Sequence, residues 1–115
     1  MSKELWKLSA VKMAEGIRNR EFSSEEVVNS VTNRIQKLNP RLNAVVGDLN
    51  PIAIDEARRA DSELESKKAT GPLHGVPVTV KCNVDVEGQP TSNGLPVFAD
   101  LIASEDSPLS LIHIS

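Results

Sequence analysis

Lys81 is the residue of this sequence whose type and setting are most suggestive of chemistry. It follows the run Val76–Val80, which reads Val-Pro-Val-Thr-Val, and it precedes Cys82, the only cysteine. A lysine amine that is shielded from water loses its charge more readily and can then accept a proton as a general base. A lysine on the solvent side of an edge strand is also ordinary and does no chemistry. The residues alone leave both interpretations open.

The other reactive side chains have weaker surroundings. A neighbouring cation can activate a thiol, but adjacent strand residues point to opposite faces, so Lys81 and Cys82 are not expected to converge. We therefore favour a structural role for Cys82. His74 stands beside Leu73 and Gly75, a context more typical of a hydrogen bond within a loop than of catalysis. No carboxylate has histidine or cysteine at metal-ligand spacing, so we expect neither a metal nor a cofactor.

Composition narrows the class of protein. The chain has 115 residues, a net charge of -3, 39% hydrophobic residues and only 3% aromatic residues. This length suits one small domain, and the absence of a basic stripe argues against nucleic acid as a partner. A single cysteine excludes an internal disulfide framework. The N-terminal residues lack the apolar core of a secretory signal and no run reaches membrane-spanning length, so we expect a cytoplasmic protein.

Three helices are predicted ahead of the Lys81 segment. Ser9 is a candidate cap for a short helix with Ala10, Ala14 and Ile17 facing inward. Ser23 and Glu26 have the spacing of a capping box. A stripe at helical spacing follows this box and consists of Val27, Val28, Val31, Ile35 and Leu38. Asn39-Pro40 is expected to end that helix, because proline disfavours helical backbone in the residue before it.

The rest of the chain is predicted as short strands, one more helix and turns. Residues 42–46 are predicted as a strand, and Asn50-Pro51 opens a third helix. Its narrow inward face consists of Ile54, Ala57, Ala60, Asp61 and Leu64, and an ion pair between Asp55 and Arg59 is expected outside. Residues 76–80 form the second predicted strand, and four glycines and prolines between residues 88 and 96 indicate loop.

Several ordered blocks of the sequence resemble the amidase signature family. Residues 71–94, "GPLHGVPVTVKCNVDVEGQPTSNG", are similar to its Gly-Pro-Leu-x-Gly-Val/Ile-Pro block, which ends in a lysine and is followed by a Thr-Thr/Ser-x-Gly turn. Residues 22–46, 53–64 and 104–108 resemble its N-terminal helix and Leu-Asn-Ala strand, its alanine-rich third helix and its Glu-Asp-Ala/Ser-Pro stretch. The resemblance covers roughly residues 4–108, so residues 1–108 are expected to be the N-terminal part of an amidase signature domain. Agreement of several blocks in order is more specific than a match to any one motif.

This resemblance implies an α/β fold, a mixed sheet flanked by helices, of which the chain holds the N-terminal helices and first strands. It also implies hydrolysis of linear small-molecule amides by a Ser–cis-Ser–Lys triad whose lysine is Lys81. Where the family commonly has aspartate, this chain has Cys82. The family's Gly-Gly-Ser-Ser-Gly segment, which carries both serines, is absent, so the chain by itself is expected to be inactive. Ser92, Ser104 and Ser107 lack glycine-rich surroundings and are not credible nucleophiles.

Two other functions stay open at this point. Within the same family, the alternative is the A-type subunit of a tRNA-dependent amidotransferase, although nothing basic or partner-specific in these residues favours it. A non-enzymatic helical interaction module is the alternative outside enzymes. An amidase fragment is expected to leave apolar helix faces exposed, such as the stripe of Val27, Val31 and Ile35, because their full partners would be missing.

The last seven residues, Leu109–Ser115, depart from the family pattern. They read "LSLIHIS" and resemble the translation of a transposon end that serves as a sequencing adapter. We therefore expect residues 109–115 to be a non-native tail, and His113 to take no part in any mechanism. An ordinary strand-like tail is the alternative.

Overall fold

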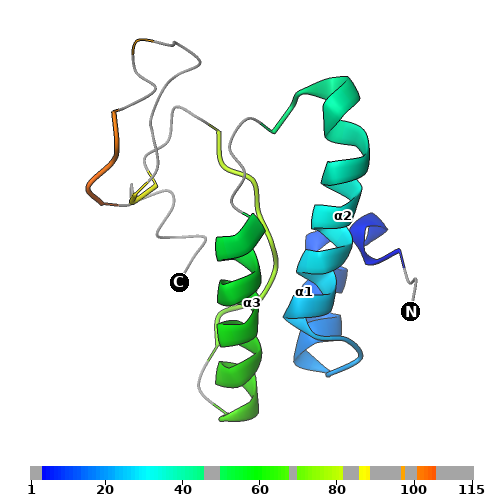
Figure 1. Ribbon diagram of the computed structural model, residues 1–115. Helices are drawn as coiled ribbons and strands as arrows, with labels where there is room; N and C mark the ends of the chain where they lie inside the picture. The colour runs from blue at the N-terminus through cyan, green and yellow to red at the C-terminus, as the bar shows by residue number, and fades with distance from the viewer. Residues whose placement is uncertain are drawn as a thin grey trace. The chain divides into compact units, whose positions relative to one another are not determined.

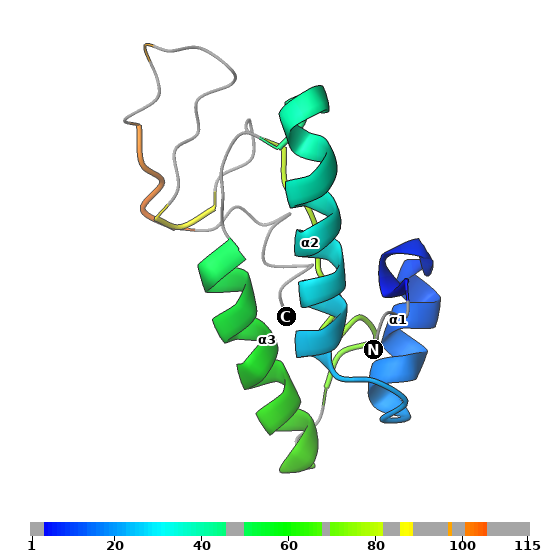
Figure 2. The same ribbon diagram turned by 45° about the vertical axis from the view of Figure 1, so that its right-hand side comes forward.

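The computed structural model describes residues 4–45, 50–67, 70–81, 86–88, 97 and 101–105. The chain divides into two units, Met1–Pro77 and Val78–Ser115. The described part of the first unit is helical (Figure 1), and its elements are the short 3-10 helix η1 (Leu5–Lys7) and the helices α1 (Ala10–Arg18), α2 (Ser24–Leu42) and α3 (Asn50–Glu65). In the turned view α2 lies between α1 and α3 (Figure 2), and it packs against both α3 and η1.

The core of the first unit lies where α1, α2 and η1 meet. It is a cluster of buried apolar side chains formed by Leu5, Met13, Ile17 and Val27. Ile17 is 1% exposed and Val27 is fully buried. Half-buried apolar side chains from the loops, from α2 and from α3 extend this cluster at Leu8, Phe22, Val31, Leu64 and Val76. The expectation of an exposed valine stripe on α2 is therefore wrong for Val27, because η1 and α1 already cover it.

Helix α1 begins as predicted, but its buried face is rotated. The Ser9 hydroxyl oxygen accepts from the Lys12 amide at 3.2 Å, which satisfies one of the free N–H groups of the first turn. Ala14 and Ile17 are buried as predicted, whereas Ala10 is exposed. The buried set instead includes Met13 and Gly16, and the apolar bulk of Met13 turns the inward face of the helix toward it.

The predicted capping box starts helix α2. The Ser23 hydroxyl oxygen accepts from the Glu26 amide at 3.1 Å. Glu26 reaches back to the same hydroxyl, which donates to its carboxylate Oε1 at 3.5 Å. The box therefore closes through two side chains, and the first turn of α2 begins where the sequence indicates.

Helix α2 continues past the point where it was predicted to stop. Pro40 lies inside it, the helix ends at Leu42, and Asn43 follows with a left-handed φ of 50°. Proline so near a C-terminus removes a single intrahelical bond, and asparagine tolerates the left-handed conformation that ends a helix. The strand predicted over residues 42–46 is therefore wrong for residues 42–45, and residue 46 lies outside the described residues.

Asn39 explains how the chain leaves α2. Its side-chain amide donates to the Val45 carbonyl at 2.8 Å, and its carbonyl oxygen accepts from the Val45 amide at 2.9 Å. The amide side chain thus satisfies both backbone groups of Val45, as a neighbouring strand would have done. A residue that was expected to end the helix instead pins the segment that follows it.

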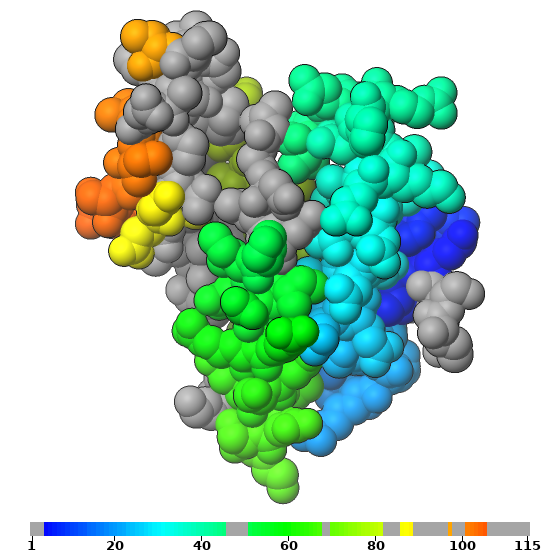
Figure 3. Space-filling model, in the orientation of Figure 1, coloured from blue at the N-terminus to red at the C-terminus, as the bar shows by residue number. Residues whose placement is uncertain are grey.

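Helix α3 confirms the predicted start and inward face. It begins at Asn50, with Pro51 in its first turn, and Ala57 is buried at its centre while Leu64 packs against the core. Figure 3 shows α2 and α3 in contact along one face of the unit. None of the helices in the described part of the chain is both long and apolar enough to cross a bilayer.

The ion pairs on the outer face of α3 differ from the predicted pair. Asp55 faces Arg58, with Oδ1 and Nη1 3.9 Å apart. Arg59 instead contacts Glu56 at 3.4 Å and Glu63 at 3.6 Å. Four of these side chains are largely exposed and Glu63 is half-buried, so each pair contributes little to stability.

The described part of the second unit has little regular structure. Its clearest internal bond runs from the Gly88 amide to the Ala103 carbonyl at 2.9 Å. Val78 and Val80 are 53% and 45% exposed. No strand is assigned over residues 76–81, so the second predicted strand, and with it the predicted sheet, is not confirmed.

Candidate functional site

Lys81 ends the described segment that starts the second unit, and its side chain is exposed. Ser104 and Glu105 are exposed as well. Other residues that the sequence analysis weighed lie outside the described residues: Cys82, Ser92, Asp106, Ser107 and the tail 109–115 with His113. The structure therefore describes the N-terminal part of the candidate site, which consists of Lys81 and the loop that precedes it.

This loop, residues 70–77, belongs to the first unit and is tied to two of its helices. The buried hydroxyl of Ser24, at the start of α2, donates to the Gly75 carbonyl at 2.6 Å. His74 Nε2 lies 2.8 Å from the Ala60 carbonyl on α3. A carbonyl can only accept, so this contact places the hydrogen of the imidazole on Nε2. The prediction that His74 is a hydrogen-bonding residue of a loop is confirmed, and its partner lies on α3 and not in the loop.

The loop also has its own internal geometry. Two tight turns are closed by bonds from the His74 amide to the Gly71 carbonyl and from the Val76 amide to the Leu73 carbonyl, each 3.1 Å long. Gly75 has a φ of +80°, which side chains rarely adopt. A Cβ at this position would also lie 3.0 to 3.3 Å from Ser24 and Ile17. Glycine is therefore needed here both for its backbone conformation and for the close approach of α1 and α2.

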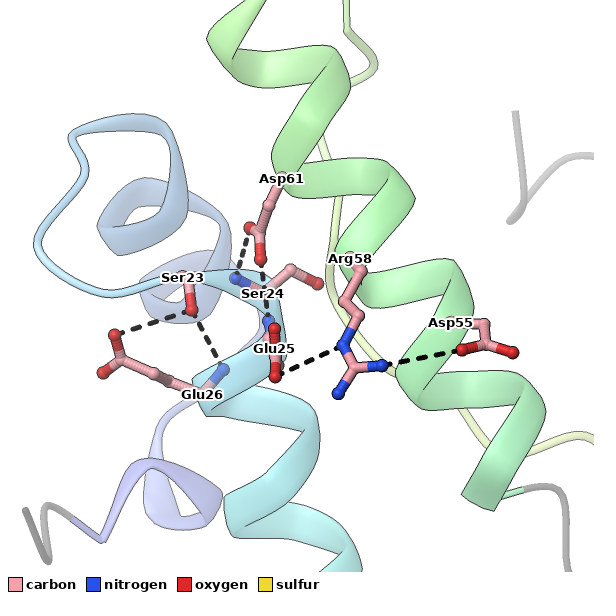
Figure 4. A network of polar contacts seen from close by, with 7 residues as sticks. All are labelled: Ser23, Ser24, Glu25, Glu26, Asp55, Arg58 and Asp61. Atoms are coloured by element: carbon pink, nitrogen blue, oxygen red, sulfur yellow. Dashed lines mark hydrogen bonds and ion pairs between the residues drawn. The ribbon is translucent and has the colours of Figure 1, made fainter.

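Asp61 fixes the end of α2 that holds this loop. Its Oδ1 accepts from the Ser24 amide at 2.7 Å and its Oδ2 accepts from the Glu25 amide at 3.1 Å (Figure 4). A carboxylate at a helix N-terminus satisfies free N–H groups and complements the helix dipole. Figure 4 also shows Arg58 between Glu25 and Asp55, with Arg58 Nε 3.4 Å from Glu25 Oε1. Helix α3 thus caps helix α2 from the side.

The sequence analysis missed this role of Asp61. It placed Asp61 on the inward face of the third helix but gave it no partner. The available signal was a carboxylate among alanines and leucines on a buried face, because such a group needs hydrogen-bond donors. Its partners lie 36 and 37 positions away in the sequence, a separation that no local pattern predicts.

A hollow of about 440 Å³ opens beside this capped helix end. Half of its lining residues are acidic, with Arg20 as the basic member, and the acidic residues are Glu21, Glu25, Glu26, Asp61 and Glu65. Both carboxylate oxygens of Asp61 are already used by the amides of α2. Among the described residues no group of histidine, cysteine and carboxylate side chains could hold a metal ion.

Comparison with known proteins decides the family. The sequence profile of the family described as Amidase matches residues 26–110, which is most of the chain and includes Lys81 and the whole anchored loop. This chain belongs to the amidase family. The resemblance read from the Gly-Pro-Leu block and its neighbours is confirmed.

Two of the proteins that this chain resembles are amide hydrolases. An indoleacetamide hydrolase from Bradyrhizobium diazoefficiens is 45% identical over 91% of this chain, and a fatty-acid amide hydrolase 2-B from Danio rerio is 42% identical over 88%. The A subunit of a glutamyl-tRNA(Gln) amidotransferase from Fusobacterium nucleatum is 30% identical over 90%. This chain spans about a fifth of the length of each relative, 20%, 20% and 21% respectively.

A solved structure supports the fold as well as the sequence match. It is reported as an unexpected vestigial protein complex that reveals the evolutionary origins of an s-triazine catabolic enzyme, and it matches 90% of this chain with a TM-score of 0.84 and 26% identity. This chain covers 23% of that structure. The arrangement described above therefore also occurs within a much longer chain.

Proposed function

We propose that this chain is part of an enzyme that hydrolyses the carbon–nitrogen bond of linear amides. The observation that carries the proposal is the identity of 45% and 42% with two amide hydrolases along nine-tenths of the chain. Identity with the tRNA amidotransferase subunit is 30%, so hydrolysis of a small amide is favoured over transfer to tRNA. Membership of an enzyme family disfavours a helical interaction module.

We propose Lys81 as the base of this reaction. It closes the Gly-Pro-Leu-His-Gly-Val-Pro block within the family match, and it follows a loop that two helices hold in place. A neutral amine there would accept a proton, which an ammonium cannot do. Lys81 is exposed in this chain, which is consistent with the role. This chain matches only a fifth of the length of the indoleacetamide hydrolase, so the rest of such an enzyme would be available to shield the lysine.

The reaction would then follow the order that the family resemblance implies. A serine hydroxyl attacks the amide carbonyl carbon while its proton passes to a bridging serine, and the bridging serine passes its own proton to the Lys81 amine. The C–N bond breaks as the amine leaving group takes up a proton. Water then attacks the acyl-serine ester and releases the acid. The two serines would come from sequence beyond these residues, so we expect the chain by itself to be inactive.

The same proposal includes the α/β fold. Residues 76–80 are rich in valine, and Val78 and Val80 leave about half of their surface exposed. Such side chains suit a strand in a sheet that both faces cover. We propose that this segment becomes a strand of a mixed sheet when the remaining strands are present. A cytoplasmic location stays a prediction.

A chimera tests the proposed function directly. Residues 4–108 of this chain would replace the matching segment of the Bradyrhizobium indoleacetamide hydrolase, and hydrolysis of indoleacetamide would be measured by release of ammonia. We expect the chimera to be active and its Lys81→Ala variant to lose kcat/KM by about 10²- to 10⁴-fold, the usual contribution of a general base. Lys37→Ala, which removes an exposed lysine of α2, is the matched control and should change kcat/KM by less than about twofold.

Two results would overturn the proposal. One is a chimera that folds, by circular dichroism and size-exclusion chromatography, yet hydrolyses no amide. The other is a Lys81→Ala variant as active as Lys37→Ala. Either result would show that the matched segment cannot supply the base.

We further propose that residues 109–115 are a non-native tail. The family match ends at residue 110, two residues into this heptapeptide. An independent read of the source locus tests the idea. Codons for Leu-Ser-Leu-Ile-His-Ile-Ser in that read would contradict it.

A further inference from the structure

We propose that Ser24 and His74 are positioning residues for Lys81, acting through the loop that they hold. The inference rests on the proposed function, because it assumes that Lys81 is the base. It adds a role for two side chains that belong to the helical unit and carry no reacting atom.

The first step is that Ser24 itself has no freedom to move. Its side chain is 1% exposed, and its backbone amide donates to Asp61 Oδ1 at 2.7 Å. Ser23, and not Ser24, supplies the local cap of α2. The Ser24 hydroxyl does not cap the helix, and it donates to the Gly75 carbonyl at 2.6 Å. Buried polar groups that are fully paired define a single arrangement.

The second step is that the loop has two such tethers on consecutive residues. Gly75 is held by α2 through Ser24, and His74 is held by α3 through the Ala60 carbonyl at 2.8 Å. Val76 packs against the core directly afterwards. The backbone of Gly75 lies so near Ser24 and Ile17 that an added Cβ would come within 3.0 to 3.3 Å of them. The loop therefore has little room to move closer to the helices, and the two bonds oppose its moving away.

The third step links the loop to the base along the chain. Lys81 is six residues after Gly75, and Pro77 between them fixes one backbone torsion. A general base works only within hydrogen-bond reach of the proton it takes. A displacement of about 1 Å at such a group can lower the rate about 10²-fold. A loop fixed at residues 74–76 would define where the segment that carries Lys81 starts.

The alternative is that the Ser24 bond only stabilises the fold. Ser30 provides the matched control, because it lies on the same helix and its hydroxyl oxygen accepts from the Trp6 amide at 3.2 Å. Ser30→Ala removes a side-chain hydrogen bond between the same helix and a distant segment, but it leaves the loop untouched. A purely structural role predicts the same kinetic effect for Ser24→Ala and Ser30→Ala at equal loss of stability.

The kinetic experiment uses the chimera described above. For Ser24→Ala we expect kcat to fall about 10- to 100-fold with KM changed by less than about threefold, because the lost interaction positions a group in the transition state. For Ser30→Ala we expect kcat within about twofold of the parent. Melting temperatures of both variants would be measured, and rates would be compared well below the lower of them.

His74 gives a second, independent arm in case Ser24→Ala does not fold. His74→Ala removes the tether to Ala60, and we expect kcat to fall about 10-fold. His74→Gln retains a side-chain N–H that can reach a carbonyl, and it should restore at least half of the lost activity. Rescue by the conservative variant would not be expected if the imidazole acted only as a spacer.

A measurement on the chain itself reports the position of the loop without activity. The amide of Val76, which bonds to the Leu73 carbonyl, should exchange with solvent about 10-fold faster in Ser24→Ala than in Ser30→Ala, as expected when one buried hydrogen bond is lost. Equal exchange rates in the two variants would show that Ser24 does not hold the loop.

The outcomes separate this inference from the proposed function. If Lys81→Ala abolishes activity while Ser24→Ala behaves like Ser30→Ala, the positioning role is wrong and the proposed function stands. If Lys81→Ala retains full activity, the proposed function fails, and the positioning role fails with it. Loss of kcat in Ser24→Ala and His74→Ala, with an inactive Lys81→Ala, supports both.

Discussion

The two units of this chain differ in what they do with their apolar side chains. In the first unit, residues from η1, α1 and α2 enclose Ile17 and Val27 almost completely. In the described part of the second unit, Val78, Leu101 and Ile102 each expose more than half of their surface. The helical unit therefore completes a small core from its own residues, whereas the valine-rich segment that carries Lys81 needs neighbours from elsewhere.

This difference matters for where function can reside. A general base needs a shielded environment that keeps it neutral, and the described residues around Lys81 provide none. What the helical unit can provide is a fixed starting point for the Lys81 segment, through Ser24, His74 and Gly75. Under the proposed function, this chain would contribute the position of the base, and sequence beyond it would contribute shielding and the nucleophile.

The largest expected effect in stability tests the contrast between the two units directly. Ile17→Ala should lower the free energy of unfolding by about 2–5 kcal/mol, because it leaves a cavity in the core. Val80→Ala removes an exposed side chain and should change that free energy by less than about 0.5 kcal/mol. Urea denaturation of the chain, followed by the helical circular dichroism signal, measures both. Equal losses for the two variants would mean that the second unit is packed as tightly as the first.

An intermediate effect on stability is expected at two glycines that have the same backbone conformation but different surroundings. Gly75 and Gly88 have φ values of +80° and +78°, so alanine is strained at both, by roughly 1–2 kcal/mol. At Gly75 the new Cβ would also crowd Ser24 and Ile17, whereas at Gly88 nothing lies within 4 Å. Crowding in a packed site adds about 1–3 kcal/mol.

We therefore expect Gly75→Ala to destabilise the chain more than Gly88→Ala by at least about 1 kcal/mol. The same urea experiment, with equal slopes for the two variants, gives the difference. If Gly88→Ala proved the more harmful, the close approach of the loop to α1 and α2 would be wrong.

The smallest expected effect lies at the exposed start of the helical unit. A hydrogen bond from Lys7 and the attraction of its charge lower the pKa of Glu4, with a slight contribution from Arg34. Because the folded-state pKa is lowered, the stabilisation is present above the unfolded pKa and is lost as the pH falls through the folded one. Lys7→Ala should raise the pKa of Glu4 toward its ordinary value, while Lys12→Ala should not. A carboxyl-carbon NMR titration measures this, and an unchanged Glu4 in Lys7→Ala would contradict the contact.

Local patterns predicted the helices of this chain well. The Ser9 cap and the Ser23–Glu26 capping box are formed by residues three positions apart, so the sequence contains both partners in one window. The inward faces of α2 and α3 also follow from helical spacing. The block around Lys81 was recognised by its resemblance to the amidase signature family and not from local rules of structure.

Local rules failed at two places, for different reasons. Pro40 was expected to end α2, yet the helix continues to Leu42, because proline so near a C-terminus removes a single intrahelical bond. The capping of Ser24 and Glu25 by Asp61 joins segments 36 or 37 residues apart. The environment of Lys81 was beyond prediction for a related reason, because a strand in a sheet is defined by strands that pair with it.

The claim on which this account depends is that Lys81 activates a serine nucleophile. The rate at which a fluorophosphonate labels the reactive serine of the chimera measures that activation without requiring complete turnover. We predict labelling of the Lys81→Ala variant at least about 100-fold slower than that of the parent and of Lys37→Ala. Labelling of the Lys81→Ala variant at the parent rate would contradict the account.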